Sequence, residues 1–491
     1  MGLSYSIIGY LENDNIENSF NIDKEYNWMK LNIKLSKAAW VQILLWDSNN
    51  VLRLQYLYGK SPQNIVISDN EKFCSSSVVP GIINEGKWKL KVISANIDEE
   101  NEYSIDVSLG NEELFLERDF EPMGKSWVKY DRNMELIIND YNEEAKCKLK
   151  KWYKGDFHTH TNVSDGKLSP SELMEVAKKQ NLDFFVITDH NIIQTGFPES
   201  EVLVIPGIEI TSFKGHFNAL GAKKWVDFTR EGAMTTEGGM NGLLSEFKAS
   251  GALCSMNHPA LTPWAWLYKD TLLSNFTTVE VLNDPTFKGN APKATEAALK
   301  LWNTMWNDGY KIWGIGGSDA HNLPTETYEN SKMPSIIGDP ATFVLADSLR
   351  AEDIMEAVKG GRVYVSRGLT LKIDIEVCGS NFCPGSDMTK LVSTEEKTIK
   401  YKLTIMEGDS NCEVLWIKDG TVQHKGKLVK NIVSEYEFSW KGEEYSWFRF
   451  EIRDCYGNLL AFANPIYKGF KNHKINTFGQ LLKASGGVEF E

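Results

Sequence analysis

Hydrophobic and polar positions alternate with a period of two along the first part of the chain. Residues 29–35, 88–92 and 105–109 each place an apolar side chain at every second position. Because successive side chains of a strand face opposite sides of a sheet, this pattern is typical of strands with one buried face. Short runs of this kind, separated by Gly, Asn and Pro clusters, predict a β-sandwich-like domain with its connector over residues 1–145.

The middle of the chain shows a different pattern, in which short apolar runs alternate with stretches of helical periodicity. The first helical stretch begins with a capping box, Ser169 to Glu172, and precedes the apolar run 184–188. Further apolar runs are 202–205, 252–256, 279–282, 312–315, 343–345 and 363–365, and further helical stretches are 242–249, 292–307 and 351–359. Apolar strands that alternate with helices predict a parallel sheet covered on both faces. About seven such units over residues 152–367 favour a barrel.

Strict alternation returns after this region. Residues 371–377 and 448–453 again place an apolar side chain at every second position, and residues 454–457 then form a turn signal. The pattern predicts a second β-sandwich-like domain, with a tail, over residues 368–491.

Composition and charge narrow the function classes. The chain has 491 residues, 42% of them hydrophobic, and a formal net charge of −14. An acidic chain disfavours general binding to nucleic acid or membrane surfaces, and no apolar run approaches the roughly 20 residues of a membrane span. The N-terminus shows no signal-peptide pattern, and the seven cysteines are scattered without a C-x-x-C pair. We therefore expect a cytoplasmic protein that acts on a small molecule.

Histidine and carboxylate residues gather at the ends of the predicted strands in the middle region. Six of the eight histidines lie between residues 158 and 321. His158 with His160, and Asp319 with His321, have the i, i+2 spacing that places both side chains on one face of a strand. The C-terminal strand ends of a parallel barrel meet at one rim, so we expect the whole set to converge. The set is His158, His160, Asp165, His190, Glu209, His216, His258, Asp319 and His321.

Metal ions would explain why such groups are buried together. Unpaired imidazoles and carboxylates are costly to bury, and shared cations remove that cost. Imidazole and carboxylate ligands without thiolate suit Zn, Mn, Fe or Co, and nine ligands exceed the needs of one ion. We therefore predict two or three divalent ions, with Glu209 as a bridging ligand. Taken singly, the residues have simpler interpretations: His216 or His258 as a hydrogen-bonded structural histidine, and Asp319 as a helix cap.

Eight of these nine residues, all but His216, lie in five motifs: HxHTxxSDG at 158–166, TDHN at 188–191, IPGIE at 205–209, NHP at 257–259 and GSDAH at 317–321. In this order they resemble the motifs of the PHP (polymerase and histidinol phosphatase) superfamily. The lead-in 152–156 and the flanking β-domains resemble its carbaryl-hydrolase-like branch of metallohydrolases. The resemblance implies an α/β fold, namely a distorted seven-stranded (β/α)7 barrel flanked by two β-sandwich-like domains.

The resemblance also implies how the ligands divide among the ions. His158, His160, Glu209 and Asp319 would hold the first ion. Glu209, His216 and His258 would hold the second, and Asp165, His190 and His321 the third. Asp165 stands where many relatives have His, which bears on whether the third site is filled. The implied metals are Zn, Mn or Fe.

The reaction expected of such a centre is hydrolysis. A water that bridges two ions has its pKa lowered from about 15.7 towards about 7, which provides a hydroxide nucleophile at neutral pH. Three divalent ions outweigh the charge of three carboxylates, which favours an anionic phosphate mono- or diester as substrate. Arg362 is a candidate for binding that substrate, or else for a structural salt bridge. The alternatives are a carboxylester or carbamate hydrolase with the same centre, and a non-enzymatic binding protein with a vestigial barrel.

Overall fold

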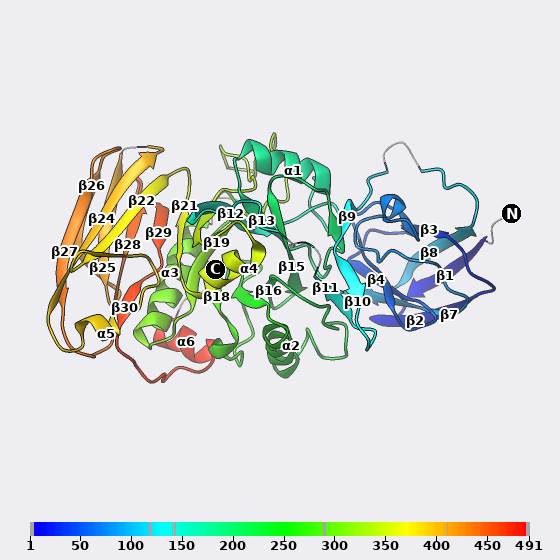
Figure 1. The fold of residues 1–491 in the computed structure, drawn as a ribbon. Helices are drawn as coiled ribbons and strands as arrows, with labels where there is room; N and C mark the ends of the chain where they lie inside the picture. Colours follow the sequence, from blue (N-terminus) through cyan, green and yellow to red (C-terminus); the bar gives the residue numbers. More distant parts are fainter. Residues whose placement is uncertain are drawn as a thin grey trace.

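The computed structural model describes residues 4–116, 120–139, 141, 144–287, 291–409 and 411–487. It is a mixed α/β, strand-rich structure in which three hydrophobic cores follow one another along the molecule. Figure 1 shows the N-terminal strands at one end, the C-terminal strands at the other, and the helix-containing region between them. Among the described residues, no helix is both long and apolar enough to cross a membrane. All seven cysteines lie in the described ranges and are free thiols.

The N-terminal region consists of two four-stranded antiparallel sheets that pack face to face, as its alternation predicts. Met29, Leu31 and Ile33 of one sheet and Trp88 and Leu90 of the other are buried in the shared core. The first sheet contains β1 (Ser4–Leu11), β8 (Asp98–Gly110), β3 (Trp28–Leu35) and β6 (Asn64–Ser68). The second contains β2 (Asn15–Ile22), β7 (Gly86–Ser94), β4 (Val41–Trp46) and β5 (Leu52–Tyr58). A 3₁₀ turn, η1 (Glu71–Phe73), follows β6.

Short strand pairs connect this sandwich to the middle region. They are formed by β9 (Lys125–Ser126) with β14 (Gly196–Phe197), and by β10 (Val128–Tyr130) with β11 (Leu136–Ile138). The middle region itself contains β12 (Lys151–Thr159), β13 (Phe184–Ile187), β15 (Leu203–Ser212), β16 (Gly215–Leu220), β17 (Leu253–Met256), β18 (Thr278–Asn283), β19 (Trp313–Gly317), β20 (Ala341–Ala346) and β21 (Val363–Ser366). Its helices are α1 (Pro170–Lys179), α2 (Glu237–Ala249), α3 (Ala291–Asn307) and α4 (Ala351–Lys359), with a 3₁₀ turn η2 (Leu273–Asn275).

Strands β12 to β19 form a curved seven-stranded sheet whose last strand returns to its first. The pairing order is β12-β13-β15-β16-β17-β18-β19, and β19 contacts β12, with a parallel bridge between Thr159, the last residue of β12, and Ala320, which follows β19. The expected all-parallel (β/α)7 barrel is not shown, because β15–β16 and β16–β17 pair antiparallel and few helices intervene. The turn Phe213–Lys214 joins β15 to β16, and so short a connection permits only an antiparallel pair.

Capping residues in the sequence set where helices α1 and α2 begin. Helix α1 begins with the predicted capping box, in which the Glu172 carboxylate accepts from the Ser169 N–H at 2.9 Å. Helix α2 begins at Glu237, five residues before the predicted start. Thr236 caps it through the Gly239 N–H, but glycines 238, 239 and 242 weaken the helical pattern in the sequence.

The C-terminal region is a second sandwich that continues the central sheet. Strand β21 pairs with β29 (Leu459–Ala463), so one sheet runs from β19 through β12 and β21 to β28 (Ser446–Arg453), β25 (Cys412–Lys418) and β26 (Thr421–Leu428), with β30 (Ile466–Lys468) beside β28. The facing sheet contains β23 (Ser380–Phe382), β22 (Thr370–Val377), β24 (Lys397–Glu407) and β27 (Ser434–Trp440). Helices α5 (Thr389–Val392) and α6 (Phe478–Ala484) complete the region, and α6 packs on α3.

Candidate metal centre

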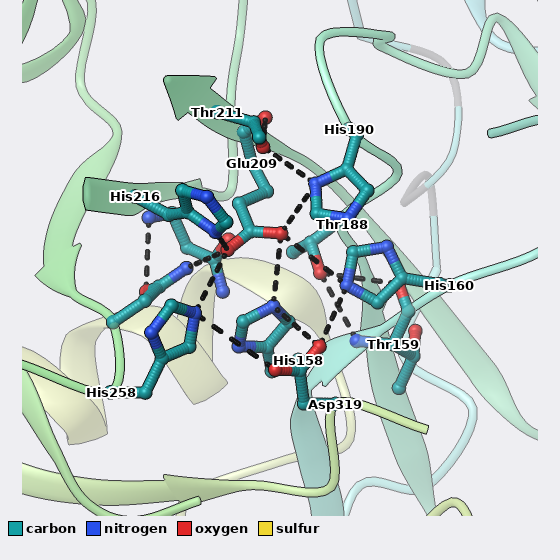
Figure 2. Close-up of polar contacts among 12 residues, drawn as sticks. His158, Thr159, His160, Thr188, His190, Glu209, Thr211, His216, His258 and Asp319 are labelled. Carbon is teal, nitrogen blue, oxygen red and sulfur yellow. Dashed lines mark hydrogen bonds and ion pairs between the residues drawn. The ribbon is translucent and has the colours of Figure 1, made fainter. Parts of the chain in front are cut away.

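All nine predicted ligands lie at one end of the curved sheet. His158 is in β12 and His160 follows it, and their rings share one side of the strand at 5.1 Å between centroids. Glu209 and His216 project from the hairpin β15–β16. The other five ligands lie on loops that follow strands: Asp165, His190, His258, Asp319 and His321. Figure 2 shows the labelled imidazoles surrounding Glu209 and Asp319.

Glu209 is the fully buried centre of the cluster. Its Oε2 lies 2.8 Å from His190 Nδ1 and 3.2 Å from His158 Nε2, and its Oε1 lies 3.1 Å from His216 Nδ1. Burial alone would raise the pKa of Glu209, but the charges of His158, His190 and His216 outweigh burial and hold that pKa well below its usual range. The carboxylate is therefore ionised, and both of its oxygens are available as ligands.

Asp319 forms the second carboxylate of the same group. Its Oδ1 lies 3.1 Å from His160 Nε2 and 3.3 Å from His158 Nε2. The backbone of Asp319 has φ 52, a left-handed conformation that is strained for an aspartate, and its N–H donates to the His158 carbonyl at 2.9 Å. The strained loop thus aims the carboxylate at the two histidines of the first strand.

Asp165 collects the remaining histidines at the more open side of the cluster. Its Oδ1 lies 3.2 Å from His321 Nε2 and 3.5 Å from His190 Nε2. Burial lowers the pKa of His321, but the Asp165 carboxylate raises it by more, so that the pKa of His321 is about 9. The pKa of His160 falls to about 3, because burial and the charges of His321 and His190 all oppose its protonation. His160 is therefore a neutral imidazole, the form that binds metals.

The ligand atoms form three overlapping sets in which every atom lies within 4.8 Å of the others. The sets are His158, His160, Glu209 and Asp319; His190, Glu209 and His216; and His160, Asp165, His190 and His321. The first is the set that the resemblance implies. The second contains His190 rather than His258, whose Nε2 is 3.5 Å from Glu209 Oε1, and the third gains His160.

The chemistry of the buried atoms fits cations. Within the described part of the chain, His158 Nε2, both His160 ring nitrogens, Glu209 Oε2 and Asp319 Oδ1 are buried without a hydrogen bond. Buried polar atoms without partners are rare and costly, and here imidazole nitrogens and carboxylate oxygens face a common space. Such a donor set suits divalent transition ions, so the residues present fit the metals that the motifs imply.

A carboxylate that none of the motifs contains supports the candidate ligands. Glu280 is buried in β18, where its Oε1 lies 2.8 Å from His158 Nδ1 and its Oε2 accepts from Asn283 Nδ2 and the His258 N–H, both at 2.9 Å. It fixes which nitrogen of His158 faces the cluster. The available signal was one carboxylate inside a continuous apolar strand, Val279–Leu282.

Arg362 is not part of the centre, contrary to its assignment as a substrate-binding residue. Strand β21 runs in the same direction as β12, so Arg362 lies near the start of β12, at the end opposite to the histidines. Its Nε donates to the Leu345 carbonyl at 3.1 Å. At the near end of β21, Arg367 instead forms a two-point ion pair with Asp339, at 2.9 and 2.8 Å.

The chain has only distant similarity to known proteins. No family model matches the chain, and no curated protein matches it. Among solved structures, a two-domain protein from Bacteroides vulgatus containing a predicted PHP-like metal-dependent phosphoesterase is 18% identical, with 66% of this chain and 99% of that chain covered and a TM-score of 0.35. An amidohydrolase from Chromobacterium violaceum is 11% identical over 37% of this chain and 93% of its own, with a TM-score of 0.22. TM-scores this low do not define a shared fold.

Proposed function

We propose that the protein is a metal-dependent phosphoesterase of the PHP superfamily that hydrolyses a phosphate mono- or diester. The observation that carries the proposal is the set of buried imidazole nitrogens and carboxylate oxygens around Glu209 and Asp319 that make no hydrogen bond. These side chains satisfy one another incompletely, so the site is built for cations that complete it.

Each set of residues has a defined part in this proposal. The three overlapping sets would hold two or three ions of Zn, Mn or Fe, with Glu209 shared between two of them. When bound, such ions supply Lewis acidity and acidify a water to a nucleophile. Glu280 orients His158, and Asn257 Nδ2 donates to Glu209 Oε1 at 2.8 Å and so fixes the carboxylate. The buried Asp189 accepts from the Thr161 N–H at 2.8 Å and holds the loop after β12.

The charge of the site favours an anionic substrate. Three divalent ions would exceed the combined charge of Asp165, Glu209, Asp319 and Glu280. Beside the more open side of the cluster, the Lys167 N–H donates to the His321 carbonyl at 2.8 Å, and the Lys167 ammonium forms a 2.6 Å ion pair with Glu326. The net positive charge of a loaded centre suits a phosphate group.

The proposal is tested with purified full-length protein reconstituted separately with Mn, Zn or Fe. The substrates are p-nitrophenyl phosphate, bis-p-nitrophenyl phosphate, naphthyl acetate and a naphthyl carbamate. We expect hydrolysis of at least one phosphoester, lost on chelation and restored by metal. Hydrolysis of the naphthyl esters alone would favour the carboxylester or carbamate hydrolase. Less than one bound ion per chain after supplementation would favour a binding protein.

A further inference from the structure

The N-terminal sandwich reaches the metal centre through one tryptophan. Trp40 immediately precedes β4, and its ring lies 5.6 Å from the His190 imidazole between centroids, at an interplanar angle of 66°. The side chain is only half-buried, and it packs on Leu57, Val163 and Ile192. An indole is therefore placed next to a candidate ligand with part of its surface still open to solvent.

Two buried glutamines fix the loop that carries His190 to the same sandwich. Gln42 Nε2 donates to the Asn191 carbonyl at 2.6 Å. Gln55 forms a pair of hydrogen bonds with the backbone of Ile193, at 3.0 and 3.1 Å. Both amides are almost completely buried, so their hydrogen bonds hold the sandwich, and Trp40 with it, against this loop.

The sandwich also contacts the loop that carries Asp165. Ser61 Oγ donates to the Val163 carbonyl at 2.7 Å, and Gly59 lies beside the Ser164 carbonyl. Asp165 and His321 are the most exposed ligands, with 31% and 23% of their side chains accessible, whereas His158, His160 and Glu209 are sealed. A substrate therefore approaches from the Asp165 side, where the N-terminal sandwich forms one boundary.

We propose that Trp40 is a specificity-determining residue that holds a planar, apolar group of the substrate against its indole. The inference rests on the proposed function, because it places the reacting phosphate at the centre and the ester group at its edge. A partly exposed indole beside the site favours aryl over small alkyl groups, through area burial and ring–ring contact. The N-terminal sandwich then selects substrates, while the middle region performs the chemistry.

The test measures binding of phenylphosphonate and methylphosphonate to metal-loaded full-length protein by calorimetry. We expect the wild-type protein to prefer phenylphosphonate, Trp40→Ala to reduce that preference by about tenfold, and Trp40→Phe to retain most of it. Metal content per chain stays unchanged in both variants. Trp152→Ala is the matched control, because Trp152 is a half-buried indole of β12 that packs on Tyr364 away from the ligands.

Two results would overturn the inference. One is an unchanged aryl preference in Trp40→Ala with full metal content. The other is loss of metal in Trp40→Ala, which would make Trp40 a structural support of His190. Should the wild-type protein bind neither phosphonate yet cleave naphthyl acetate, the phosphoesterase proposal fails separately. Trp40 is then judged by the ratio of kcat/KM for naphthyl and ethyl acetate in the same variants.

Discussion

Two clusters of buried charge in this molecule differ in whether permanent cations balance their carboxylates. In the C-terminal sandwich, Glu451 lies between two arginines, 2.6 Å from Arg449 Nη2 and 2.6 Å from Arg453 Nη2. Arg453 also pairs with Glu296 of α3, and the guanidinium of Arg449 covers the Trp302 ring at 4.7 Å. The two arginines balance the two glutamates in charge, although Arg449 Nε and Nη1 are buried without a hydrogen bond.

The cluster around Glu209 is different, because histidine ring nitrogens and carboxylate oxygens crowd together and several of them make no hydrogen bond. Burial and perturbed pKa values are common to both clusters and do not separate them. The charge balance does separate them: arginines balance the glutamates in the first cluster, whereas the second has no arginine or lysine among its members and is suited to an external cation. The comparison predicts that substitutions should cost stability in the first cluster and metal and activity in the second.

The largest expected effect is on catalysis at the centre. Glu209→Gln keeps the size of the side chain but removes the shared charge, so we expect loss of metal and a fall in kcat of about 10³-fold, the equivalent of several kcal/mol of Lewis-acid stabilisation. Metal analysis and steady-state kinetics measure the metal content and kcat. By comparison, Asp165→Asn should remove only the ion at the open side of the cluster. A Glu209→Gln protein with full metal content and activity would contradict the assignment.

The complementary substitution lies in the balanced network. Glu451→Ala leaves Arg449 buried without its partner, which should destabilise the fold by about 3 kcal/mol, whereas metal content per folded chain stays unchanged. Chemical unfolding provides the measurement. The control is Glu413→Ala, which removes an exposed pair with Lys425 and should cost about 1 kcal/mol or less. Equal effects of the two substitutions would remove the distinction between the clusters.

A smaller effect is expected from the carboxylate behind His158. Glu280→Gln keeps its packing but weakens the contact that orients the imidazole, so metal affinity should fall by about 10- to 100-fold. Chelator competition measures the affinity. Stability of the metal-free protein serves as the internal control, since a change there alone would assign Glu280 to the fold rather than to the centre.

The smallest effect concerns pH. Burial raises the pKa of Glu451, but Arg449 and Arg453 outweigh burial and hold it below the usual range. A carboxylate with a depressed folded pKa binds fewer protons when folded, so its contribution is present above the unfolded pKa and lost as pH falls through the folded pKa. We expect the stability difference between wild type and Glu451→Gln to shrink as the pH falls below about 4. A difference that is constant from pH 6 to pH 3 would contradict this.

The convergence of the nine candidate ligands could be predicted because eight of them occupy short motifs near the ends of apolar runs. His216 lies outside the motifs, at the start of β16, and joins the group because β16 pairs antiparallel with β15. The substrate-binding role predicted for Arg362 was wrong, because Arg362 precedes a strand whose first residues lie at the end of the sheet opposite to the histidines. The antiparallel hairpin β15–β16 was missed because its two-residue turn, Phe213–Lys214, has no glycine–asparagine signature.

The contacts of other residues could not be predicted from any local sequence pattern. Glu280 lies within an apolar strand, and nothing in the sequence around it indicates that it contacts His158, 122 positions earlier. Trp40 reaches His190 only because the edge of one sandwich docks on the loops of another region, with hydrogen bonds across 138 and 149 positions. Contacts of this range depend on how whole regions pack, and periodicity describes only each region separately.

The pairing of β21 with β29 limits how the molecule can be divided. A chain shortened after Arg367 would leave the backbone of β21 without its neighbour and would remove Phe462, whose ring packs on Trp302 at 5.3 Å. An unprotected strand edge of this kind recruits other chains. Attempts to produce the central region by itself should therefore yield aggregates, whereas limited proteolysis of the intact protein should spare the 367–370 junction.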